Sequence, residues 1–182
     1  MQDIYTPNLV LKVLDGSAAG DVLDFYSENP DFEEYEPARP FNFYTNEYMR
    51  EILDYEAKVI AQKRGLRLWV FEAASPYKVI GTVSFHNMIM NVYKSCQLGY
   101  KFHKDYRHKG YATEGVRCAC KVAFEEYDLH RIEAYTMPTN NSSKNLLKRI
   151  GFQYEGVARD HALIKREWRD HELYSLLEND IF

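Results

Sequence analysis

The chain has 182 residues, of which 46% are hydrophobic and 27% are charged, a composition typical of a globular protein and not of a disordered one. Lys and Arg number 23 against 27 Asp and Glu, so the formal net charge is −4 and no general attraction to nucleic acid is expected. The length suits a single domain with its own hydrophobic core, and we expect residues 1–182 to form one.

The sequence shows no targeting or membrane-spanning segment, and its cysteine content favours a reducing compartment. No apolar run approaches the roughly 20 residues that a membrane-spanning helix needs. The stretch from Met1 to Pro7 lacks a basic start followed by apolar residues, so we expect no signal peptide. Three cysteines, Cys96, Cys118 and Cys120, are too few and too unevenly spaced for a disulfide framework. Cys118 and Cys120 lie two apart on a predicted helix and point to different faces, which makes them poor joint metal ligands. A cytoplasmic location fits best.

Alternating apolar residues and turn signals predict the elements of the first half of the chain. In chain order they are a strand over 8–14, a helix over 17–27, a helix that starts after Thr45, and strands over 67–72, 79–86 and 95–102. Ser17 and Thr45 are residue types that cap helix N-termini, and Asn29-Pro30 stops the first helix. The second helix carries an apolar stripe that we expect to face inward: Tyr48, Ile52, Tyr55 and Val59.

The second half of the chain alternates helices and strands. Its predicted elements are a helix over 111–127, a strand over 131–136, a helix over 142–150 that Gly151 ends, and strands over 152–159 and 168–176. The side chains of the first of these helices that we expect to face inward are Val116, Ala119, Ala123 and Tyr127. With no repeat, low-complexity tract or linker in view, the order of elements predicts an α/β or α+β fold.

The most informative segment lies between the strand over 95–102 and the helix over 111–127. It reads Arg107-His108-Lys109-Gly110-Tyr111-Ala112. Free backbone N–H groups at a helix start, together with the helix dipole, form an anion site. Gly110 would let the backbone approach a phosphate closely, and the three basic residues before it add positive charge. A basic turn that merely starts a helix is an equally good interpretation of this segment taken alone.

Acidic residues are concentrated near the N-terminus. From Val13 to Ala38 there is no Lys or Arg but eight acidic residues: Asp15, Asp21, Asp24, Glu28, Asp31, Glu33, Glu34 and Glu36. A solvated face is the commoner meaning of such a run. The functional alternative is a field that attracts a cationic acceptor.

Downstream residues turn the basic segment into part of a larger pattern. Arg107-x-x-Gly110-x-Ala112 resembles the Arg/Gln-x-x-Gly-x-Gly/Ala signature of the Gcn5-related N-acetyltransferases (GNATs). The preceding Leu98-Gly99-Tyr100 is similar to the Rim-type branch, which acetylates N-terminal amines of ribosomal proteins, among other acceptors. Other segments at the family's spacing are Ala112-Thr113-Glu114, His130-Arg131-Ile132-Glu133-Ala134, Asn140-x-x-Ser143, Leu146-Leu147, Gly151-Phe152 and Glu155-Gly156. The likeness is dense from Val79 to Leu177.

The resemblance implies a mixed, mostly antiparallel sheet of six to seven strands flanked by about four helices. The strands over 95–102 and 131–136 would be parallel neighbours that splay apart at their C-terminal ends and hold acetyl-CoA in the opening. The residues that the resemblance assigns to this co-substrate are Tyr100, Lys101, Phe102, Arg107, His108, Lys109, Gly110, Tyr111, Ala112, Thr113, Asn140 and Ser143. The basic loop would bind the pyrophosphate, the strand edge would pair with the pantetheine arm, and Asn140 would steady that arm. A backbone N–H near Phe102 would stabilise the developing negative charge on the thioester oxygen.

The resemblance also assigns proton donation to the leaving thiolate to Ser143. A serine in the first turn of a short helix is the plainer interpretation of that residue. The general base is harder to find. Relatives often have Glu where this chain has Gln97, and some carry a further Glu at the position of Ala162. His86 is a candidate base because imidazole titrates near neutral pH, although a strand-end histidine bonded to a neighbour is the commoner case.

The lack of a carboxylate base affects which kind of amine is the easier acceptor. Deprotonating an α-amine of pKa near 8 at pH 7 costs about 1.4 kcal/mol, whereas a lysine-like nitrogen near 10.4 costs roughly 4.6 kcal/mol. An α-amine, either of a protein N-terminus or of a small molecule, is therefore the easier acceptor. Glu33 and Glu34 are possible bases from a loop, but nothing in the sequence fixes their position.

Two alternatives stay open. The acidic run favours a polyamine or antibiotic N-acetyltransferase. The residues Gln97 and Ala162, which replace carboxylates of relatives, suit a non-catalytic CoA-binding regulatory module. In each case we expect a monomer or homodimer that uses no metal and that binds neither nucleic acid nor a membrane.

Overall fold

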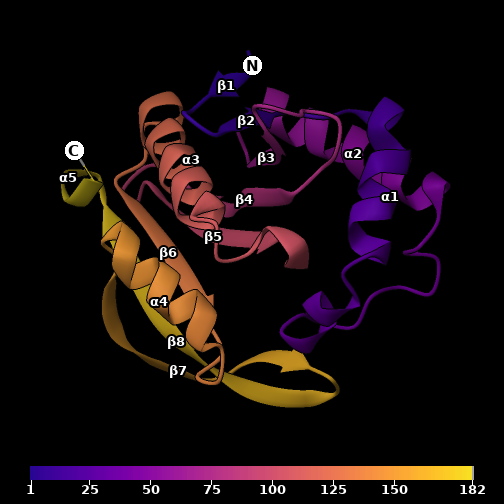
Figure 1. Ribbon diagram of the computed structural model, residues 1–182. Helices are drawn as coiled ribbons and strands as arrows, with labels where there is room; N and C mark the ends of the chain where they lie inside the picture. Colours follow the sequence, from indigo (N-terminus) through magenta and orange to yellow (C-terminus); the bar gives the residue numbers. More distant parts are fainter. Residues whose placement is uncertain (182) are drawn as a thin grey trace.

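The computed structural model of the protein describes residues 1–181 (Figure 1). Its strands are β1 (Ile4–Tyr5), β2 (Leu9–Lys12), β3 (Leu66–Glu72), β4 (Gly81–Ile89), β5 (Ser95–Phe102), β6 (Arg131–Thr136), β7 (Gln153–Ile164) and β8 (Glu167–Leu177). Its α-helices are α1 (Ala19–Ser27), α2 (Asn46–Ala61), α3 (Tyr111–Tyr127), α4 (Asn141–Ile150) and α5 (Glu178–Ile181). Three 3-10 turns are η1 (Gly16–Ala18), η2 (Pro30–Glu34) and η3 (Lys104–Tyr106). The bounds of β5, α3 and β6 are those that the sequence predicts.

The strands form one sheet in the order β1-β2-β3-β4-β5-β6-β8-β7. Strand pairs are antiparallel except β5 and β6, which are parallel. The expectation of a mixed, mostly antiparallel sheet is confirmed. The described sheet has eight strands and not six or seven, because the two-residue strand Ile4–Tyr5 pairs with β2. Two residues are too few to show the alternation by which a strand is recognised in sequence.

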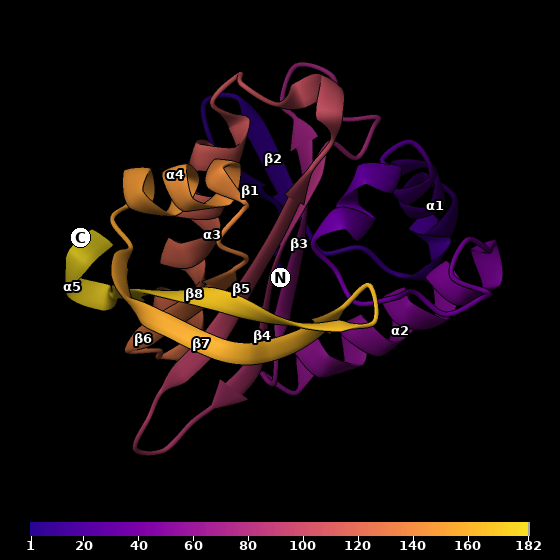
Figure 2. The same cartoon turned by 90° about the horizontal axis from the view of Figure 1, so that it is seen from below.

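Helices cover both faces of the sheet, α3 and α4 on one and α1 and α2 on the other (Figure 2). The side chains of α3 predicted to face inward are all buried in the core on their face: Val116, Ala119, Ala123 and Tyr127. On the opposite face, Trp69 of β3 packs at right angles to Phe25 of α1, with ring centroids 6.0 Å apart. Leu53 of α2 belongs to the same buried cluster.

The inward stripe predicted for α2 is wrong by one position. Met49 and Leu53 are fully buried, whereas Tyr55 is 65% exposed. Tyr48 and Ile52 are half-buried beside them. Apolar pairs at 48–49 and 52–53 offer two stripes one residue apart, and the amphipathic tyrosine ring tolerates the solvent-facing position.

Of the two predicted helix N-caps, one is confirmed and the other is wrong. Thr45 caps α2 as predicted, because its hydroxyl accepts a hydrogen bond from the N–H of Tyr48 at 3.2 Å. The prediction that Ser17 caps the first helix is wrong. The Asp15 carboxylate accepts from the N–H of Ser17 at 2.9 Å and starts η1, and α1 follows at Ala19. A charged acceptor makes the stronger hydrogen bond, so it takes the capping role.

β5 and β6 separate along their length, as the family resemblance implies. Their pairing runs from Ser95 with Arg131 to Gln97 with Glu133 and stops there. β5 continues to Phe102 and β6 to Thr136, so the C-terminal half of each strand lacks its neighbour. The opening lies between the two helical layers.

β7 and β8 form a hairpin that is longer than predicted. The strands join at a two-residue turn, Lys165 and Arg166, whose φ angles of 50° and 67° match the twist of a tight hairpin. The two views place the tip of this hairpin on the side of the molecule where α1 and α2 lie (Figures 1 and 2). The hairpin therefore reaches toward the segment that connects these two helices.

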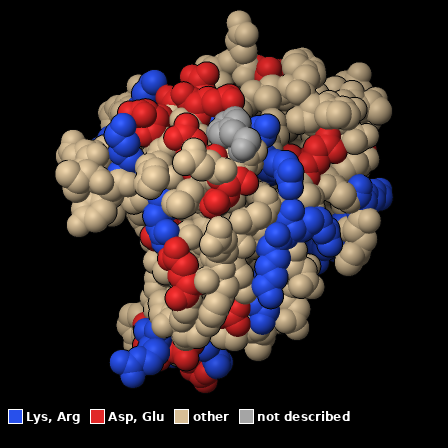
Figure 3. Space-filling view, turned by 90° about the vertical axis from the view of Figure 1, so that its left-hand side faces the viewer, with Lys and Arg blue, Asp and Glu red and all other residues tan. Residues whose placement is uncertain are grey.

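Charge is distributed unevenly over the surface. On the side shown in Figure 3, Lys and Arg side chains gather in a band, with acidic side chains grouped beside it. This side includes α4, which carries Lys144, Lys148 and Arg149 and no acidic residue. In residues 1–181 no helix has the length and apolar character to cross a membrane.

Candidate active site

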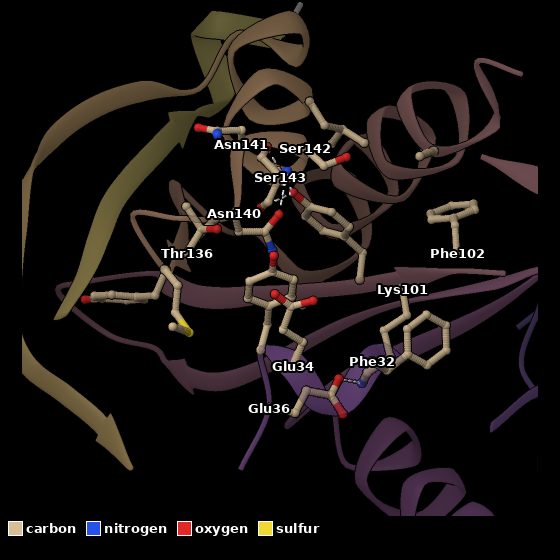
Figure 4. Close-up of a pocket in the computed structure, with 18 of the residues that line it drawn as sticks. Phe32, Glu34, Glu36, Lys101, Phe102, Thr136, Asn140, Asn141, Ser142 and Ser143 are labelled. Atoms are coloured by element: carbon tan, nitrogen blue, oxygen red, sulfur yellow. Dashed lines mark hydrogen bonds and ion pairs between the residues drawn. The ribbon is translucent and has the colours of Figure 1, made fainter. Parts of the chain in front are cut away.

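A cleft of about 590 Å³ occupies the opening between β5 and β6. Its walls come from η2, the C-terminal half of β5, the start of α3, the end of β6, the first turn of α4 and one residue of β8. Figure 4 shows the first turn of α4 on one side of the cleft, with Glu34, Glu36 and Lys101 facing it from the other. Each wall carries a different chemistry.

The start of α3 presents backbone donors. Gly110 is its N-terminal boundary residue, with φ of 85°, and no side chain caps the helix there. A glycine suits this left-handed conformation, and a Cβ on it would meet no atom within 4 Å. Arg107 and Ala112 line the cleft, while the intervening residues form the turn at its end. The helix N-terminus at which the sequence predicts an anion site is therefore uncapped, and anion binding there stays a prediction.

The side chains around this turn have their own partners. Arg107 donates through Nε to the carbonyl of Phe102 at 3.1 Å and through a terminal nitrogen to Asp31 at 2.5 Å. Tyr111 donates to Glu72 at 2.8 Å. Lys109 stacks over the ring of Tyr106. The basic side chains therefore brace the turn, and Asp31 offsets part of their charge.

The free edge of β5 offers a second set of backbone groups. The N–H of His103 donates to the carbonyl of Ile80 at 2.8 Å, on the β4 side. Because N–H groups alternate sides along a strand, those of Phe102 and Tyr100 point toward the opening. Facing them, the Thr136 hydroxyl at the end of β6 is buried and has no hydrogen-bond partner in residues 1–181. An extended amide-bearing chain would satisfy these groups.

The first turn of α4 holds Ser143. Asn140 caps this helix, since its side-chain oxygen accepts from the N–H of Ser143 at 3.0 Å. The hydroxyls of Ser143 and Tyr100 lie 2.8 Å apart. Burial raises the pKa of Tyr100, so the phenol keeps its proton at neutral pH. Helix and strand are thus joined across the cleft by one hydroxyl pair.

The segment around η2 is fixed by buried side chains. Phe32 packs into the aromatic cluster of α1 and is only 8% exposed. The Arg39 guanidinium lies over the rings of Tyr26 and Phe43 and is 7% exposed. It pairs with Glu36 at 3.4 Å. These contacts hold a segment whose regular structure is limited to the short 3-10 turn η2.

Three carboxylates of this segment face the cleft. Asp31 pairs with Arg107 at 2.5 Å, and Glu36 pairs with Lys101 at 2.7 Å. In the part of the chain that the structure describes, Glu34 lines the cleft without an ion pair. Burial, followed by the carboxylate of Glu34, raises the pKa of Tyr35 beside it. Glu33 points elsewhere, since it accepts from Tyr44 at 2.6 Å.

The base candidates lie in different places. His86 has an exposed side chain on β4 and lies outside the residues that line the cleft. Gln97 accepts from Asn87 at 2.8 Å. Ala162 pairs with a residue near the hairpin tip. A catalytic role for His86 stays a prediction.

Comparison with known proteins agrees with this geometry. The sequence model of the acetyltransferase (GNAT) domain matches residues 8–153, which is most of the chain. The chain belongs to the GNAT acetyltransferase family. The mixed sheet with its splayed parallel pair is the fold of this family, and the enzyme class is that of N-acetyltransferases.

Two relatives of this GNAT enzyme match it over nearly their whole length. The probable N-acetyltransferase YjcK of Bacillus subtilis (strain 168) is 34% identical over 174 residues, covering 94% of this chain and 95% of the relative. The [ribosomal protein uS5]-alanine N-acetyltransferase of Escherichia coli (strain K12) is 30% identical over 176 residues, covering 96% and 90%.

Solved structures show the same architecture. The ribosomal-protein-S5-alanine acetyltransferase of Vibrio fischeri superposes with a TM-score of 0.92 at 25% identity, and each chain is covered completely. Mycobacterium smegmatis RimJ, solved in complex with a CoA-disulfide, has a TM-score of 0.86 at 20% identity, covering 95% of this chain and 83% of its own.

Several lining residues of this GNAT enzyme are absent from the sequence-based assignment. They are Asp31, Glu36, Tyr135, Thr136, Met137 and His171. The acidic run contained a signal for the first two, but a run alone does not show which members face a cleft. Within residues 1–181 no group of three or more His, Cys, Asp or Glu is placed to hold a metal ion.

Proposed function

We propose that this enzyme transfers the acetyl group of acetyl-CoA to a primary α-amine, of a protein N-terminus or a small molecule, by direct attack in a ternary complex. The observation that carries the proposal is the cleft where β5 and β6 part. An uncapped helix N-terminus, an unpaired strand edge and one carboxylate without a cation meet there. The acceptor named for the Escherichia coli and Vibrio fischeri relatives, a ribosomal-protein alanine, supports the same class.

The donor side fits acetyl-CoA in three places. The turn from Arg107 to Thr113 supplies backbone N–H groups and positive charge for the pyrophosphate. The edge of β5 supplies donors and acceptors for the pantetheine amides, and the orphaned Thr136 hydroxyl gains a partner. A backbone N–H at the end of this edge would stabilise negative charge on the thioester oxygen, which is worth about 3 kcal/mol.

Ser143 is the proposed proton donor to the leaving thiolate. Its hydroxyl lies in the cleft at the first turn of α4, and Tyr100 is within hydrogen-bond distance of it. When the tyrosine donates to Ser143, the serine proton is free to point toward the sulfur. Asn140 caps the same helix and keeps its NH2 group available for the pantetheine arm.

The acceptor side favours a single positive charge. Of the three carboxylates that face the cleft, Lys101 and Arg107 neutralise two, and Glu34 is left to attract an ammonium group. A polyamine carries several ammonium groups and needs several free carboxylates. One free carboxylate therefore suits an α-amine better than spermidine. Three free cysteines agree with a reducing cytoplasm as the place of the reaction.

An acceptor screen tests the proposal. Release of free thiol from acetyl-CoA is measured with a peptide that has a free N-terminal alanine, with the same peptide N-terminally blocked and carrying a lysine, and with spermidine. We expect turnover with the free N-terminus and little with the other two. Ser143→Ala should bind acetyl-CoA in calorimetry and turn over more slowly.

Two results would overturn this function. A preference for spermidine or the lysine side chain would replace the α-amine with a different acceptor class. Binding of acetyl-CoA with no acetylation of any free N-terminus or amino-acid amide would favour a regulatory module that only binds CoA.

A further inference from the structure

His171 occupies a particular place in the sheet. Pairing between β6 and β8 ends at Thr136 with Glu172, and His171 is the next residue of β8 beyond that pair. Its side chain is 6% exposed and lines the cleft. The ring therefore stands at the edge of the opening, shielded from bulk solvent but in contact with the space where the reactants would meet.

The ring faces the acceptor side of the sheet. Its neighbour Glu172 faces α4, since it pairs with Lys144 at 3.3 Å, and Tyr174 belongs to the core beneath α3 and α4. Side chains alternate along a strand, so His171 points to the opposite face, where η2 lies. Ser143, on α4, and His171 thus line the same cleft from opposite layers.

A backbone contact fixes which ring nitrogen carries the proton. Nδ1 of His171 lies 3.0 Å from the carbonyl oxygen of Arg169. A carbonyl only accepts, so Nδ1 must be the N–H donor in this bond. In the neutral ring, Nε2 then carries the lone pair. The main chain of β8 thus prepares the ring to accept a proton at Nε2.

A β-bulge in the β7–β8 hairpin places a second histidine ring against that of His171. Ala158 pairs with His171 and Ala162 with Arg169, so residues 159–161 of β7 stand opposite the single residue Asp170. This bulge places the His161 ring 5.1 Å from that of His171, and His161 stacks on Tyr135 at 4.1 Å. Bulges commonly re-aim side chains beside functional sites. His171 therefore packs against the His161 ring of β7, which in turn stacks on Tyr135 of β6.

The charged and titratable groups around His171 come from five elements. They are His161 and Asp160 of β7, Tyr135 of β6, Arg169, Asp170 and Glu172 of β8, Tyr100 and Lys101 of β5 with Arg107 after it, and Asp31, Glu34, Tyr35 and Glu36 of the η2 segment. The carboxylates of the η2 segment outnumber the cations across the cleft, which favours binding of an ammonium group between them and His171.

We propose that His171 is the general base for the acceptor, taking a proton from its α-ammonium group at Nε2. One ammonium proton passes to Nε2 and from there to solvent. The amine nitrogen then bonds to the acetyl carbon, and the carbon–sulfur bond breaks. The nitrogen gives up a second proton, which balances the one that the thiolate gains by way of Ser143. The inference rests on the proposed function and names the base that Gln97 and Ala162 do not supply.

The test uses two acceptors and two histidines. His171→Asn keeps an amide N–H for the Arg169 carbonyl but takes up no proton. With a peptide bearing an N-terminal alanine, we expect it to lose roughly 10- to 100-fold in kcat/KM at pH 7. The difference in kcat/KM between wild type and His171→Asn should narrow toward pH 9, where the α-amine of the free peptide is already neutral. A peptide that begins with an aminooxyacetyl group, which is uncharged at neutral pH, should be acetylated by wild type and variant within about threefold.

His130→Asn is the matched control, since this histidine is exposed just before β6 and does not line the cleft. It should stay within about threefold of wild type on both peptides. Thermal unfolding and acetyl-CoA calorimetry show whether each variant is folded, and His171→Gln provides a second substitution. Equal losses on the two peptides, a loss that does not change with pH, or wild-type activity on the alanine peptide would overturn the proposal. An inactive wild type would instead refute the proposed function.

Discussion

The hydroxyl of Tyr100 on β5 lies 2.8 Å from the Ser143 hydroxyl on α4. The bond spans the opening between the two splayed strands and orients a serine that would otherwise rotate freely. Burial raises the pKa of the phenol, so Tyr100 stays protonated and can donate to the Ser143 hydroxyl or to the Ser143 carbonyl oxygen, which lies 3.4 Å away. Two side chains from separate elements are therefore linked at the position proposed for proton donation.

This pairing predicts coupled effects of substitution. Ser143→Ala should lower kcat by roughly 10- to 100-fold with little change in acetyl-CoA affinity, because general acid catalysis is lost. Tyr100→Phe should lower kcat by about fivefold, and the double variant should resemble Ser143→Ala alone. Steady-state kinetics with calorimetry measures all three. Additive losses would show that the two hydroxyls act independently.

Asp31 and Arg107 predict an electrostatic effect on donor binding. Their side chains are 2.5 Å apart and each is about 40% exposed, at 42% and 38%. Asp31→Asn removes a negative charge from beside the phosphate loop, so the Kd for CoA should fall by about two- to fivefold. Arg107→Ala should raise it by roughly tenfold. Calorimetry at two salt concentrations measures both changes.

The control for this charge effect is Asp21→Asn. Asp21 belongs to the same acidic run but lies on α1 and does not line the cleft. Its substitution should leave the Kd for CoA unchanged. If Asp21→Asn tightened binding as much as Asp31→Asn, the effect would come from net charge and not from the contact with Arg107.

Local patterns predict well the elements at which acetyl-CoA is proposed to bind. The strand over 95–102, the basic turn and α3 are contiguous in sequence, and the alternation of residues and the helical period are strong there. Gly151 ends α4 with φ of 117°, as its residue type indicates. These features need only near neighbours, so the sequence contains most of the information.

The acceptor half depends on tertiary contacts. Glu34 and Glu36 reach the cleft because Phe32 and Arg39 pin an irregular segment to the aromatic core of α1. His171 reaches it because β8 inserts between β6 and β7 and a bulge shifts the register. No short-range period encodes strand order or a bulge, which is why the sequence shows these residues without showing their role.

The close packing around Gly81 predicts that a larger residue there affects both the stability of the core and the binding of acetyl-CoA. A Cβ at this position of β4 would lie 2.7 and 2.8 Å from ring atoms of Phe102 and 3.0 Å from the carbonyl oxygen of Lys101. Gly81→Ala should therefore displace Phe102, cost about 1–3 kcal/mol in the free energy of unfolding, and raise the KM for acetyl-CoA. Urea unfolding and kinetics measure the two effects.

Gly20 provides the matched comparison. It is an exposed residue of α1, and a Cβ there would come no closer than 3.9 Å to a neighbour. Gly20→Ala should raise the free energy of unfolding by about 0.5–1 kcal/mol, because alanine favours a helix, and leave the KM unchanged. A Gly81→Ala protein as stable as wild type would show that β4 and β5 yield without disturbing the edge.

The contacts of Glu155 predict an ion pair between β6 and β7 whose contribution to stability is lost at acid pH. The Arg131 guanidinium reaches over β8 and holds both oxygens of Glu155, at 2.8 and 2.5 Å, while Ser175 of β8 donates to the same carboxylate at 2.6 Å. The hydrogen bonds from Arg131, followed by that from Ser175, lower the pKa of Glu155 to about 2. A carboxylate with a lowered pKa in the folded state stabilises the fold above its unfolded pKa.

The stabilisation is therefore present at pH 7 and is lost as the pH falls from about 4.5 toward 2. Because the Glu155 side chain is 36% exposed, solvent screening limits its contribution to about 1 kcal/mol. Glu155→Gln keeps an acceptor for Ser175 and removes the charge, so it should lower the free energy of unfolding by that amount at pH 7. Urea unfolding between pH 7 and pH 3 should show the free energies of unfolding of the two proteins converging as the pH falls.

Glu167→Gln, which removes an exposed partner of Arg169 at the hairpin tip, should have a smaller effect. A difference that persists undiminished to pH 3 would mean that the Glu155 carboxylate stabilises the fold by packing and not by its charge.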